Sequence, residues 1–559
     1  MKKQELKIFG LIFTAAFALS GCSLFFPKSS SKESHPVSSK EQTSAHSTAS
    51  SVEDSLEESD TNPISKTKFQ YNYKDYSKHS YLDYDFTPSV GNPRLLVIPI
   101  WFTDSNHCIH ANHLEDVRED IQTAYFGTEE ETGWQSVKTY YHRMSQGRCE
   151  IDGVVSDWYE TGESMSVYGS DSQATENLLV TATDWYFNQP DSEPRSYFDT
   201  DNDGFLDGVM LIYAAPDLVS AYNDWDSNND GRENFWAYTS WSMSQPNKEN
   251  PTPNAFFWAS YDFMYDTSTA NIRTGLYFYG GGDASNCNVD AHTFIHEMGH
   301  MFGLPDYYDY SKQYNPAGGF SMQDNNVGGH DPYSALALGW ADPYVPEESC
   351  TLTIRPFQNG GRDLVLLQPY GFNVDGSPFD EYILLELYTP TGLNQFDCEH
   401  TYREYSGLAQ GPMATGIRIW HVDARLVKIN DRGLGRITVD ATHPKKVPNE
   451  DDLYFMMTNT YFSQREDMTG RLSVCGTGYY NYNILQLIRN DTMTTYQPQN
   501  DLADTDLFGN GSQFTCSQFN GQFVNGKKLN SGDLLGWTVN VTITGEGANA
   551  RATLQLFRD

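Results

Sequence analysis

The feature that most constrains this chain is the sequence H-E-x-x-H formed by His296, Glu297 and His300, followed by Gly303 and Asp306. On an α-helix the two histidines stand four residues apart, so their rings project from one face and can share a metal ion. Zinc binds imidazole nitrogen readily, and a catalytic zinc site needs three protein ligands and an open position for water. Gly303 can adopt the left-handed conformation that ends a helix, which lets the chain turn back and present Asp306 as the third ligand.

Glu297 directly follows the first histidine and is the candidate general base, because H-E-x-x-H on a helix is typical of zinc peptidases. One alternative is a surface helix with two solvated histidines and no metal. Against it, the helix is predicted to end at Gly303-Leu304-Pro305, where the extended motif requires an end. Another alternative takes a distant glutamate as third ligand, as in thermolysin-like enzymes. The spacing of Gly303 and Asp306 argues against that reading.

The N-terminus predicts export from the cell. Three lysines precede an apolar run of twelve residues, Ile8–Leu19, which is too short to span a bilayer but fits a signal-peptide core. Leu19-Ser-Gly-Cys22 resembles a bacterial lipobox, and this resemblance implies cleavage before Cys22 and its acylation. Residues 1–22 are then a lipoprotein signal peptide, and acyl chains hold the protein on the outer leaflet of the membrane. The alternative is an ordinary secretory signal with an unmodified cysteine.

Residues 23–67 are predicted to form a solvated tether. The segment is rich in Ser, Lys, Glu and Thr and has almost no large apolar side chains from residue 27 onward, so it cannot bury enough surface to fold. A propeptide is the competing interpretation, but the segment lacks the apolar pattern of a folded pro-domain. It also has no obvious cysteine to block a metal.

The formal charge of the chain is −37, from 74 acidic and 37 basic residues. This excess argues against nucleic acid and anionic lipid as partners, so the membrane is expected to be reached through the lipid anchor only. Of eight cysteines, Cys22 is assigned to lipidation, which leaves seven. None of these forms a C-x-x-C pair, and an odd number leaves at least one free thiol. Nothing in the sequence indicates an oligomer.

The remaining chain divides into an α/β region and an all-β region. Strands are predicted at 94–102, 149–155 and 208–214, and helices at 113–125, 136–144, 174–187 and about 290–303. This mixture predicts an α/β catalytic domain, residues 68–348, with a mixed sheet and an active-site helix. From about residue 350, short apolar strands such as 382–387, 416–420 and 537–543 alternate with turns. Residues 349–559 are therefore predicted to be β-rich, as one module or as two divided near residue 470.

Two acidic loops are candidate calcium sites. Asp199, Asp201, Asp203 and Asp207 place oxygen donors around Gly204, an arrangement that a hard cation such as calcium prefers. The bidentate glutamate of an EF-hand loop is missing, because Met210 occupies that position. A second loop, with Asp226, Asn228 and Asp230 before Gly231, repeats the pattern more weakly. The alternative for both is a polar turn without metal, since Asp, Asn and Gly favour turns.

These residues together resemble the immune inhibitor A type of bacterial secreted metallopeptidases, within the metzincin clan. The resemblance is carried by HEMGHMFGLPDYYD at 296–309, by Phe320-Ser-Met322, and by the segment from Pro332 to Leu338-Gly-Trp340. Residues 136–153 and 199–214 are similar to the segments that precede the active site in this family. Residues 382–387 and 416–423 look like its strands that follow the catalytic domain.

The resemblance implies zinc on His296, His300 and Asp306, Glu297 as general base, and Met322 in a Met-turn beneath the metal. An ordinary core methionine is the alternative for Met322. Two departures from the family stand out. Gln323 and Asp324 occupy the place where some metzincins carry a tyrosine that stabilises the oxyanion. The folded N-terminal pro-region of the family is also absent.

The function expected from the sequence is a lipid-anchored zinc endopeptidase of the bacterial cell surface that acts on protein or peptide substrates. One zinc is the catalytic cofactor, and calcium is a structural one. Shedding from the anchor as an extracellular form stays open. The alternative is a surface-binding or adhesion lipoprotein with a vestigial metal site, which suits the acidic surface and the long tether equally well. The intact general base and ligands favour the enzyme.

Overall fold

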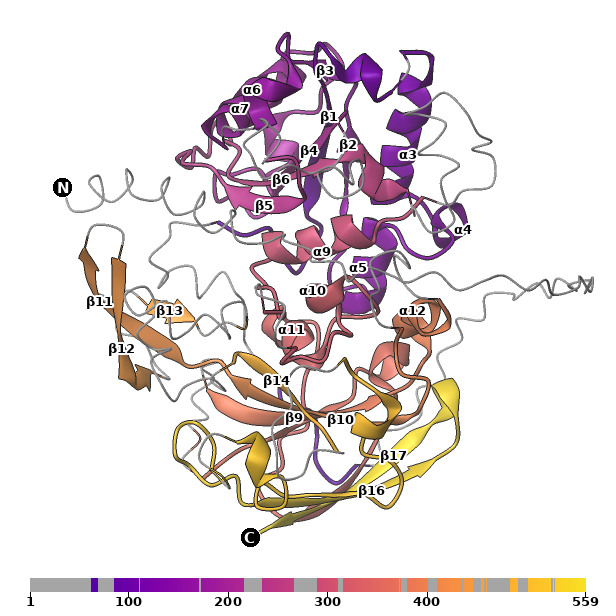
Figure 1. Ribbon diagram of the computed structural model, residues 1–559, viewed down its shortest axis with the longest axis vertical. Helices are drawn as coiled ribbons and strands as arrows, with labels where there is room; N and C mark the ends of the chain where they lie inside the picture. Colours follow the sequence, from indigo (N-terminus) through magenta and orange to yellow (C-terminus); the bar gives the residue numbers. More distant parts are fainter. Residues whose placement is uncertain are drawn as a thin grey trace, which may run out of the picture.

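The structure is a computed structural model of the 559-residue chain. It describes residues 62–68, 85–109, 111–169, 172–215, 234–265, 289–309, 315–370, 372, 380–400, 410–433, 436–445, 454–456, 459, 483–490, 501–523, 526 and 528–559. An α/β part occupies the upper half of Figure 1 and a β-rich part the lower half, with the helix that carries the histidines between them.

The α/β part is built on one six-stranded sheet with the order β2-β1-β4-β6-β5, in which β3 also pairs with β1. All neighbouring strands run parallel except β5, which pairs antiparallel with β6 at the edge. The strands are β1 Arg94–Trp101, β2 Asp152–Val155, β3 Tyr159–Glu160, β4 Gly208–Tyr213, β5 Tyr238–Trp241 and β6 Ala255–Ser260. The mixed sheet predicted from the sequence is thus present, and β1 and β4 lie where the apolar runs predicted them.

Helices cover both faces of this sheet, which explains why its central strands are continuously apolar. Residues such as Leu95 and Met210 pack with α3, α5 and α9 on one face, whereas Leu96 and Leu211 pack with α7 on the other. The helices are α3 Leu114–Phe126, α4 Glu129–Thr132, α5 Val137–Ser145, α6 Met165–Gly169, α7 Ser172–Phe187 and α9 His292–Met301. The helices predicted at 113–125, 136–144, 174–187 and 290–303 are confirmed within a few residues at each end.

The β-rich part contains two four-stranded antiparallel sheets and a smaller three-stranded one. The four-stranded sheets have the orders β14-β10-β9-β8 and β15-β16-β17-β7, and the third has the order β12-β11-β13. The strands are β7 Cys350–Ile354, β8 Leu364–Leu367, β9 Glu381–Tyr388, β10 Gly416–Asp423, β11 Leu426–Gly433, β12 Arg436–Lys445, β13 Tyr454–Met456, β14 Leu485–Ile488, β15 Gln513–Phe514, β16 Trp537–Thr544 and β17 Arg551–Arg558. Strands from both sides of residue 470 share each four-stranded sheet, so no division of these sheets falls there.

The sheet that contains β9 and β10 is buried on both faces. Ile383 and Leu385 face a core shared with the other four-stranded sheet, whereas Tyr382 and Leu384 join the core that contains α9. Three short helices lie between this sheet and α9 (Figure 1): α10 Met322–Asn325, α11 Pro332–Ala337 and α12 Gln395–Glu399. The hydrophobic core therefore runs without a break from the α/β part into the β-rich part.

The end of the predicted tether is packed rather than solvated. Asn62 exchanges two hydrogen bonds with the backbone of Thr353 in β7, at 2.7 and 2.9 Å. Lys66 lies 2.7 Å from a carboxylate oxygen of Asp363, which is buried. The Asn62 side-chain bonds and the partly buried Lys66 ion pair hold this segment against the β-rich part despite its polar composition, whereas the sequence predicted a solvated tether up to residue 67. Residues 1–61, with the signal peptide and Cys22, lie outside the described residues.

Candidate metal centre

The histidine motif lies on α9 as predicted, with its donors turned to one side. The rings of His296 and His300 have centroids 4.8 Å apart and planes at 87°. The helix ends at Met301, and Gly303 follows with φ +103°, a conformation that L-residues with side chains rarely adopt. This turn reverses the chain and brings Asp306 back beside the two rings.

The three predicted ligands meet at one point. Nε2 of His296 and Nε2 of His300 each lie 3.1 Å from Oδ1 of Asp306, and the two nitrogens lie 3.1 Å from each other. Zinc bound at roughly 2.0 Å by tetrahedral ligands holds its donor atoms about 3.3 Å apart. These three atoms, which we call the donor triangle, are therefore spaced close to the distances that one zinc ion requires.

Hydrogen bonds at the Nδ1 atoms of His296 and His300 fix the direction in which each Nε2 lone pair points. Nδ1 of His296 donates to the backbone carbonyl of Met322 and Nδ1 of His300 to that of Leu304, both at 2.7 Å. Such a bond fixes the tautomer and leaves the Nε2 lone pair free for a metal. With both rings in this state, two nitrogen lone pairs and a carboxylate oxygen converge with no proton between them. A cation at their centre removes that conflict.

The electrostatics of the cluster favour positive charge at the same point. Although burial opposes the shift, the two imidazoles hold the pKa of Asp306 well below its usual range. Burial lowers the pKa of His300, but the Asp306 carboxylate outweighs it and raises that pKa to about 9. Of the three side chains only His300 keeps appreciable exposure, at 16%. The centre is thus nearly enclosed and reaches solvent beside His300.

Glu297 lies beside this centre and is held by a residue that the sequence did not reveal. An oxygen of its carboxylate lies within 4.8 Å of donor nitrogens of both histidines. Oγ1 of Thr239, on the edge strand β5, lies 3.1 Å from Oε2 of Glu297 and 2.9 Å from its backbone carbonyl oxygen. Burial raises the pKa of Glu297, and the two histidines oppose that rise. No motif surrounds Thr239, so only the fold brings it to Glu297.

Met322 and Gln323 pack against α9, the helix that carries the histidines. The Met322 side chain is fully buried in the core beneath α9, and its carbonyl accepts the His296 bond described above. Gln323 is also fully buried, and its Nε2 lies 3.3 Å from Nδ1 of His300. A side chain at Gly299 would collide with Gln323 at 2.1 Å, so the glycine in the motif makes room for this amide. Gln323, which stands with Asp324 where some metzincins carry a tyrosine, therefore packs against α9.

The first acidic loop brings together three of its four candidate ligands. Carboxylate oxygens of Asp199, Asp201 and Asp203 lie within 4.8 Å of one another. Asp207 instead accepts hydrogen bonds from the backbone nitrogen of Arg94 at 2.7 Å and from both the backbone and the hydroxyl of Thr200. Burial raises its pKa to about 7. Asp207 therefore stabilises the start of β1 rather than joining the cluster.

Several other candidates lie outside the described residues or away from the centre. Asp226, Asn228 and Asp230 of the second loop fall within residues 216–233, which are not described. The five described cysteines, Cys108, Cys149, Cys350, Cys398 and Cys516, are free thiols and form no disulfide with one another. None of them lies in the donor triangle.

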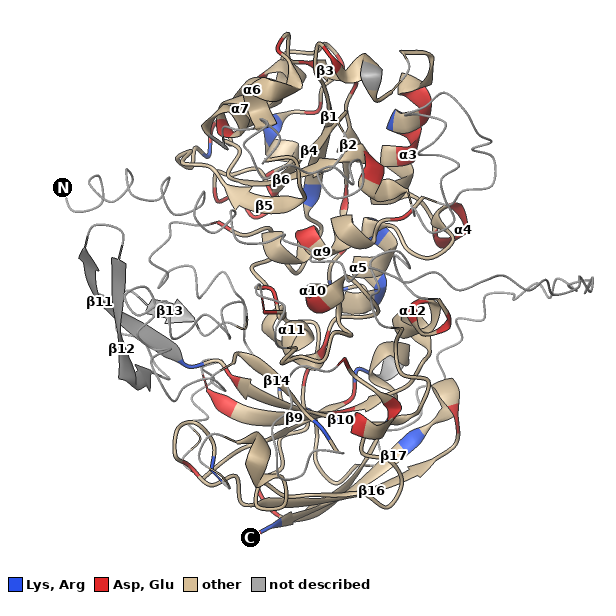
Figure 2. Ribbon diagram, viewed as in Figure 1, with Lys and Arg blue, Asp and Glu red and all other residues tan. Residues whose placement is uncertain are grey.

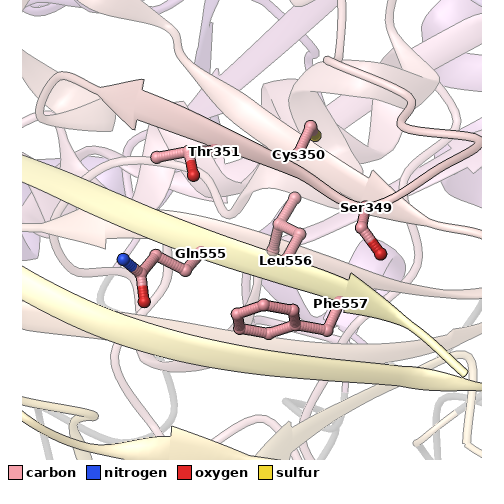
Figure 3. A pocket seen from close by; sticks show the side chains of 6 residues that line it. All are labelled: Ser349, Cys350, Thr351, Gln555, Leu556 and Phe557. Atoms are coloured by element: carbon pink, nitrogen blue, oxygen red, sulfur yellow. The ribbon is translucent and has the colours of Figure 1, made fainter.

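A surface hollow of the β-rich part provides no second centre. It lies between β7 and β17 and is lined by Ser349, Cys350, Thr351, Gln555, Leu556 and Phe557 (Figure 3). Its one thiol, Cys350, has a pKa raised by burial, which makes it a weaker nucleophile at neutral pH. The candidate metal ligands lie on and after α9, and Figure 2 shows acidic segments on α9 and α10.

Comparison with known proteins gives one similarity, within the α/β part. Residues 94–187 match the family model described as immune inhibitor A peptidase M6, catalytic domain. A search of curated proteins gave no match. The matched segment covers β1 to α7 and ends before α9, so the family assignment and the donor triangle are independent observations. Among the described residues, no helix is both long enough and apolar enough to cross a bilayer. This match supports the interpretation of the chain as an immune inhibitor A-type peptidase, and thus as a metallopeptidase.

Proposed function

We propose that this protein is a zinc-dependent endopeptidase in which Glu297 is the general base. The observation that carries the proposal is the convergence of Nε2 of His296, Nε2 of His300 and Oδ1 of Asp306 at mutual distances of 3.1 Å. Two nitrogens and one oxygen in a nearly closed site suit zinc better than calcium or magnesium, which prefer oxygen donors alone. When bound, zinc supplies Lewis acidity and lowers the pKa of a water towards ~7.

The protein groups supply the proton transfers. The Glu297 carboxylate takes a proton from the attacking water and later delivers that proton to the leaving amine. One carboxylate can serve both steps because the water and the amine react at the same carbonyl carbon. Its raised pKa suits this exchange, because a base is most effective when its pKa approaches the working pH. Thr239 orients the carboxylate through the 3.1 Å contact with Oε2.

The edge strand β5 provides a place for an extended substrate. In the sheet order β5 is terminal, so one of its edges has no strand partner among the described residues. Its four residues, Tyr238–Trp241, are half-buried, and Thr239 within it touches Glu297. A peptide that pairs with this edge through its backbone would lie beside Glu297, the proposed general base. Backbone pairing would make cleavage depend on an extended substrate conformation more than on one side chain.

Glu297→Gln tests the general-base assignment. The amide keeps the size of the side chain and its contact with Thr239 but cannot accept the proton. We expect hydrolysis of a quenched fluorescent peptide library to fall at least 1,000-fold, of the order that loss of a general base produces. Zinc content should stay near one per chain, because Glu297 is not a ligand.

The matched control is Glu150→Gln, since Glu150 is an exposed carboxylate bonded to His142. It should leave the rate unchanged. Substantial activity in Glu297→Gln would contradict the assignment. The alternative of a binding lipoprotein with a vestigial site also suits the acidic surface and the long tether, but the presence of Glu297 and of all three donors close together favours the enzyme.

We propose further that the protein is anchored to the outer leaflet through a lipidated Cys22, and that Asp199, Asp201 and Asp203 hold calcium. The anchor is supported by the apolar run and the Leu-Ser-Gly-Cys sequence, and calcium by three clustered carboxylates. Cys22→Ala should abolish palmitate labelling and move the protein from the membrane fraction. Labelling that persists in the variant would remove Cys22 from the proposal.

A further inference from the structure

Two buried charged groups of the β-rich part bond segments that adjoin the candidate metal centre. Arg418, on β10, and Asp397, on α12, are each 1% exposed. Charged side chains are rarely buried so completely unless they are paired, because removing them from water costs several kcal/mol. The partner of Arg418, Phe320, lies two residues before Met322, whose carbonyl bonds His296. The partner of Asp397, His292, lies one helical turn before His296.

Arg418 connects β10 to the turn that carries Met322. Its Nη1 donates to the backbone carbonyl of Phe320 at 3.1 Å. Two residues later, the carbonyl of Met322 accepts the Nδ1 proton of His296 at 2.7 Å. Nε of Arg418 donates to Glu386 on β9 at 2.6 Å, so the guanidinium is itself held by the sheet.

Asp397 connects α12 to the beginning of α9. Its two oxygens lie 3.2 and 3.3 Å from Nε2 of His292, which stands one helical turn before His296. The His292 ring is fully buried and stacks on Trp134 with centroids 3.9 Å apart and planes 8° from parallel. Oδ2 of Asp397 also accepts from the backbone nitrogen of Gly328 at 2.6 Å, in the segment that follows α10.

Both connections act on groups that aim the zinc ligands. A ligating histidine is oriented by the partner of its second nitrogen, and loss of such a partner typically costs 10- to 100-fold in metal affinity. For His296 that partner is the Met322 carbonyl, and the turn that presents it is tied to Arg418. For α9 as a whole, the first turn is tied to Asp397. Both contacts, from Arg418 on β10 and from Asp397 on α12, come from the β-rich part and not from the sheet of the α/β part.

We propose that the β-rich part positions the zinc ligands, with Arg418 holding the Met322 turn and Asp397 holding the first turn of α9. Arg418 and Asp397 are positioning residues, since neither touches the donor triangle. The β-rich part is then required for the geometry of the metal centre although it supplies no ligand. A chain truncated near residue 348 would lack this support. The inference rests on the proposed zinc site.

The test compares zinc affinity in variants of the full chain. Arg418→Met combined with Glu386→Gln removes both charges of the buried pair at once and keeps an amide oxygen for the Trp420 indole, which donates to Glu386 at 3.0 Å. Asp397→Asn is the milder variant, because it keeps an oxygen for Gly328 and loses only the charge that faces His292. The dissociation constant is measured by competition with a chromophoric chelator. Circular dichroism of the apo-proteins reports folding.

The matched control is Arg425→Met with Asp423→Asn. This buried pair also involves β10, with bonds of 2.8 and 2.9 Å, but it lies at the other end of the strand and bonds Asn530 instead of the Met322 turn. We expect both test variants to bind zinc roughly 10- to 100-fold more weakly than the unaltered chain. The control should stay within about twofold.

Folded test variants that hold zinc as tightly as the unaltered chain would overturn the inference, as would a control that weakens zinc equally. If the double variant does not fold, Asp397→Asn decides alone. Failure of the unaltered chain to bind zinc would contradict the proposed function instead, so the two failures are distinguishable.

Discussion

At the scale of residues, the centre depends on a few hydrogen bonds whose partners are far apart in the sequence. The convergence of the three candidate ligands was predictable, because His296, His300 and Asp306 lie within eleven residues and their spacing expresses helix and turn geometry. Thr239 was not predictable, since it stands 58 residues from Glu297 on a separate strand. Arg418 and Asp397 lie about 100 residues from their partners Phe320 and His292, with separations of 98 and 105. Such contacts follow from the sheet order, which no local pattern encodes.

The role of Thr239 is open to a direct test. Thr239→Val keeps the shape of the side chain but cannot bond the Glu297 carboxylate. A hydrogen bond to a charged group contributes about 1.5–3 kcal/mol, so we expect kcat to fall roughly tenfold or more while KM stays unchanged. Thr239→Ser restores the hydroxyl and should recover most of the rate. Equal kcat values for the valine variant and the unaltered chain would contradict this role, as would a serine variant as slow as the valine variant.

At the scale of elements, most helices and strands formed where periodicity predicted them. The apolar runs at 94–102 and 208–214 became β1 and β4 because helices cover both faces of their sheet. The helix predicted at 136–144 became α5, where Ser136 and Thr139 form reciprocal capping bonds. The antiparallel edge strand β5 was not predicted, because its four residues are too few for a pattern. It is nevertheless the strand that contacts Glu297, the proposed general base.

The first acidic loop shows how far a motif predicts at this scale. Its Asp-x-Asp-x-Asp-Gly spacing predicted the convergence of Asp199, Asp201 and Asp203. Gly204 has φ +98°, and its backbone nitrogen donates to Asp199, which closes the turn. The fourth candidate, Asp207, lies where the loop becomes β4, and the backbone of Arg94 competes for its carboxylate. The loop motif therefore predicted the positions of the first three carboxylates but not that of Asp207, whose place is set by the pairing of β4 with β1.

At the scale of the whole molecule, the two parts predicted from the pattern of helices and strands share one continuous core. The sequence predicted an α/β part and a β-rich part, but it did not predict that β9 and β10 would be buried on both faces. The apolar run Tyr382–Leu385 in β9 reflects that burial, since a sheet with one face in water would alternate apolar and polar residues. In β10 the polar residues Arg418 and His421 interrupt the pattern, and both are buried with carboxylate partners. The packing of Asn62 and Lys66 against the β-rich part also shows where the N-terminal segment joins the folded protein.

The central claim is that two imidazoles and one carboxylate hold a single catalytic zinc ion. The most direct measurement is metal analysis of the purified full-length protein combined with X-ray absorption at the zinc edge. We predict one zinc per chain with nitrogen and oxygen neighbours at roughly 2.0–2.2 Å, and calcium in addition if the first acidic loop binds it. Peptide hydrolysis should disappear with a zinc chelator and return with added zinc. A protein that hydrolyses peptides at full rate with no stoichiometric zinc, or whose zinc has sulfur neighbours, would contradict the account.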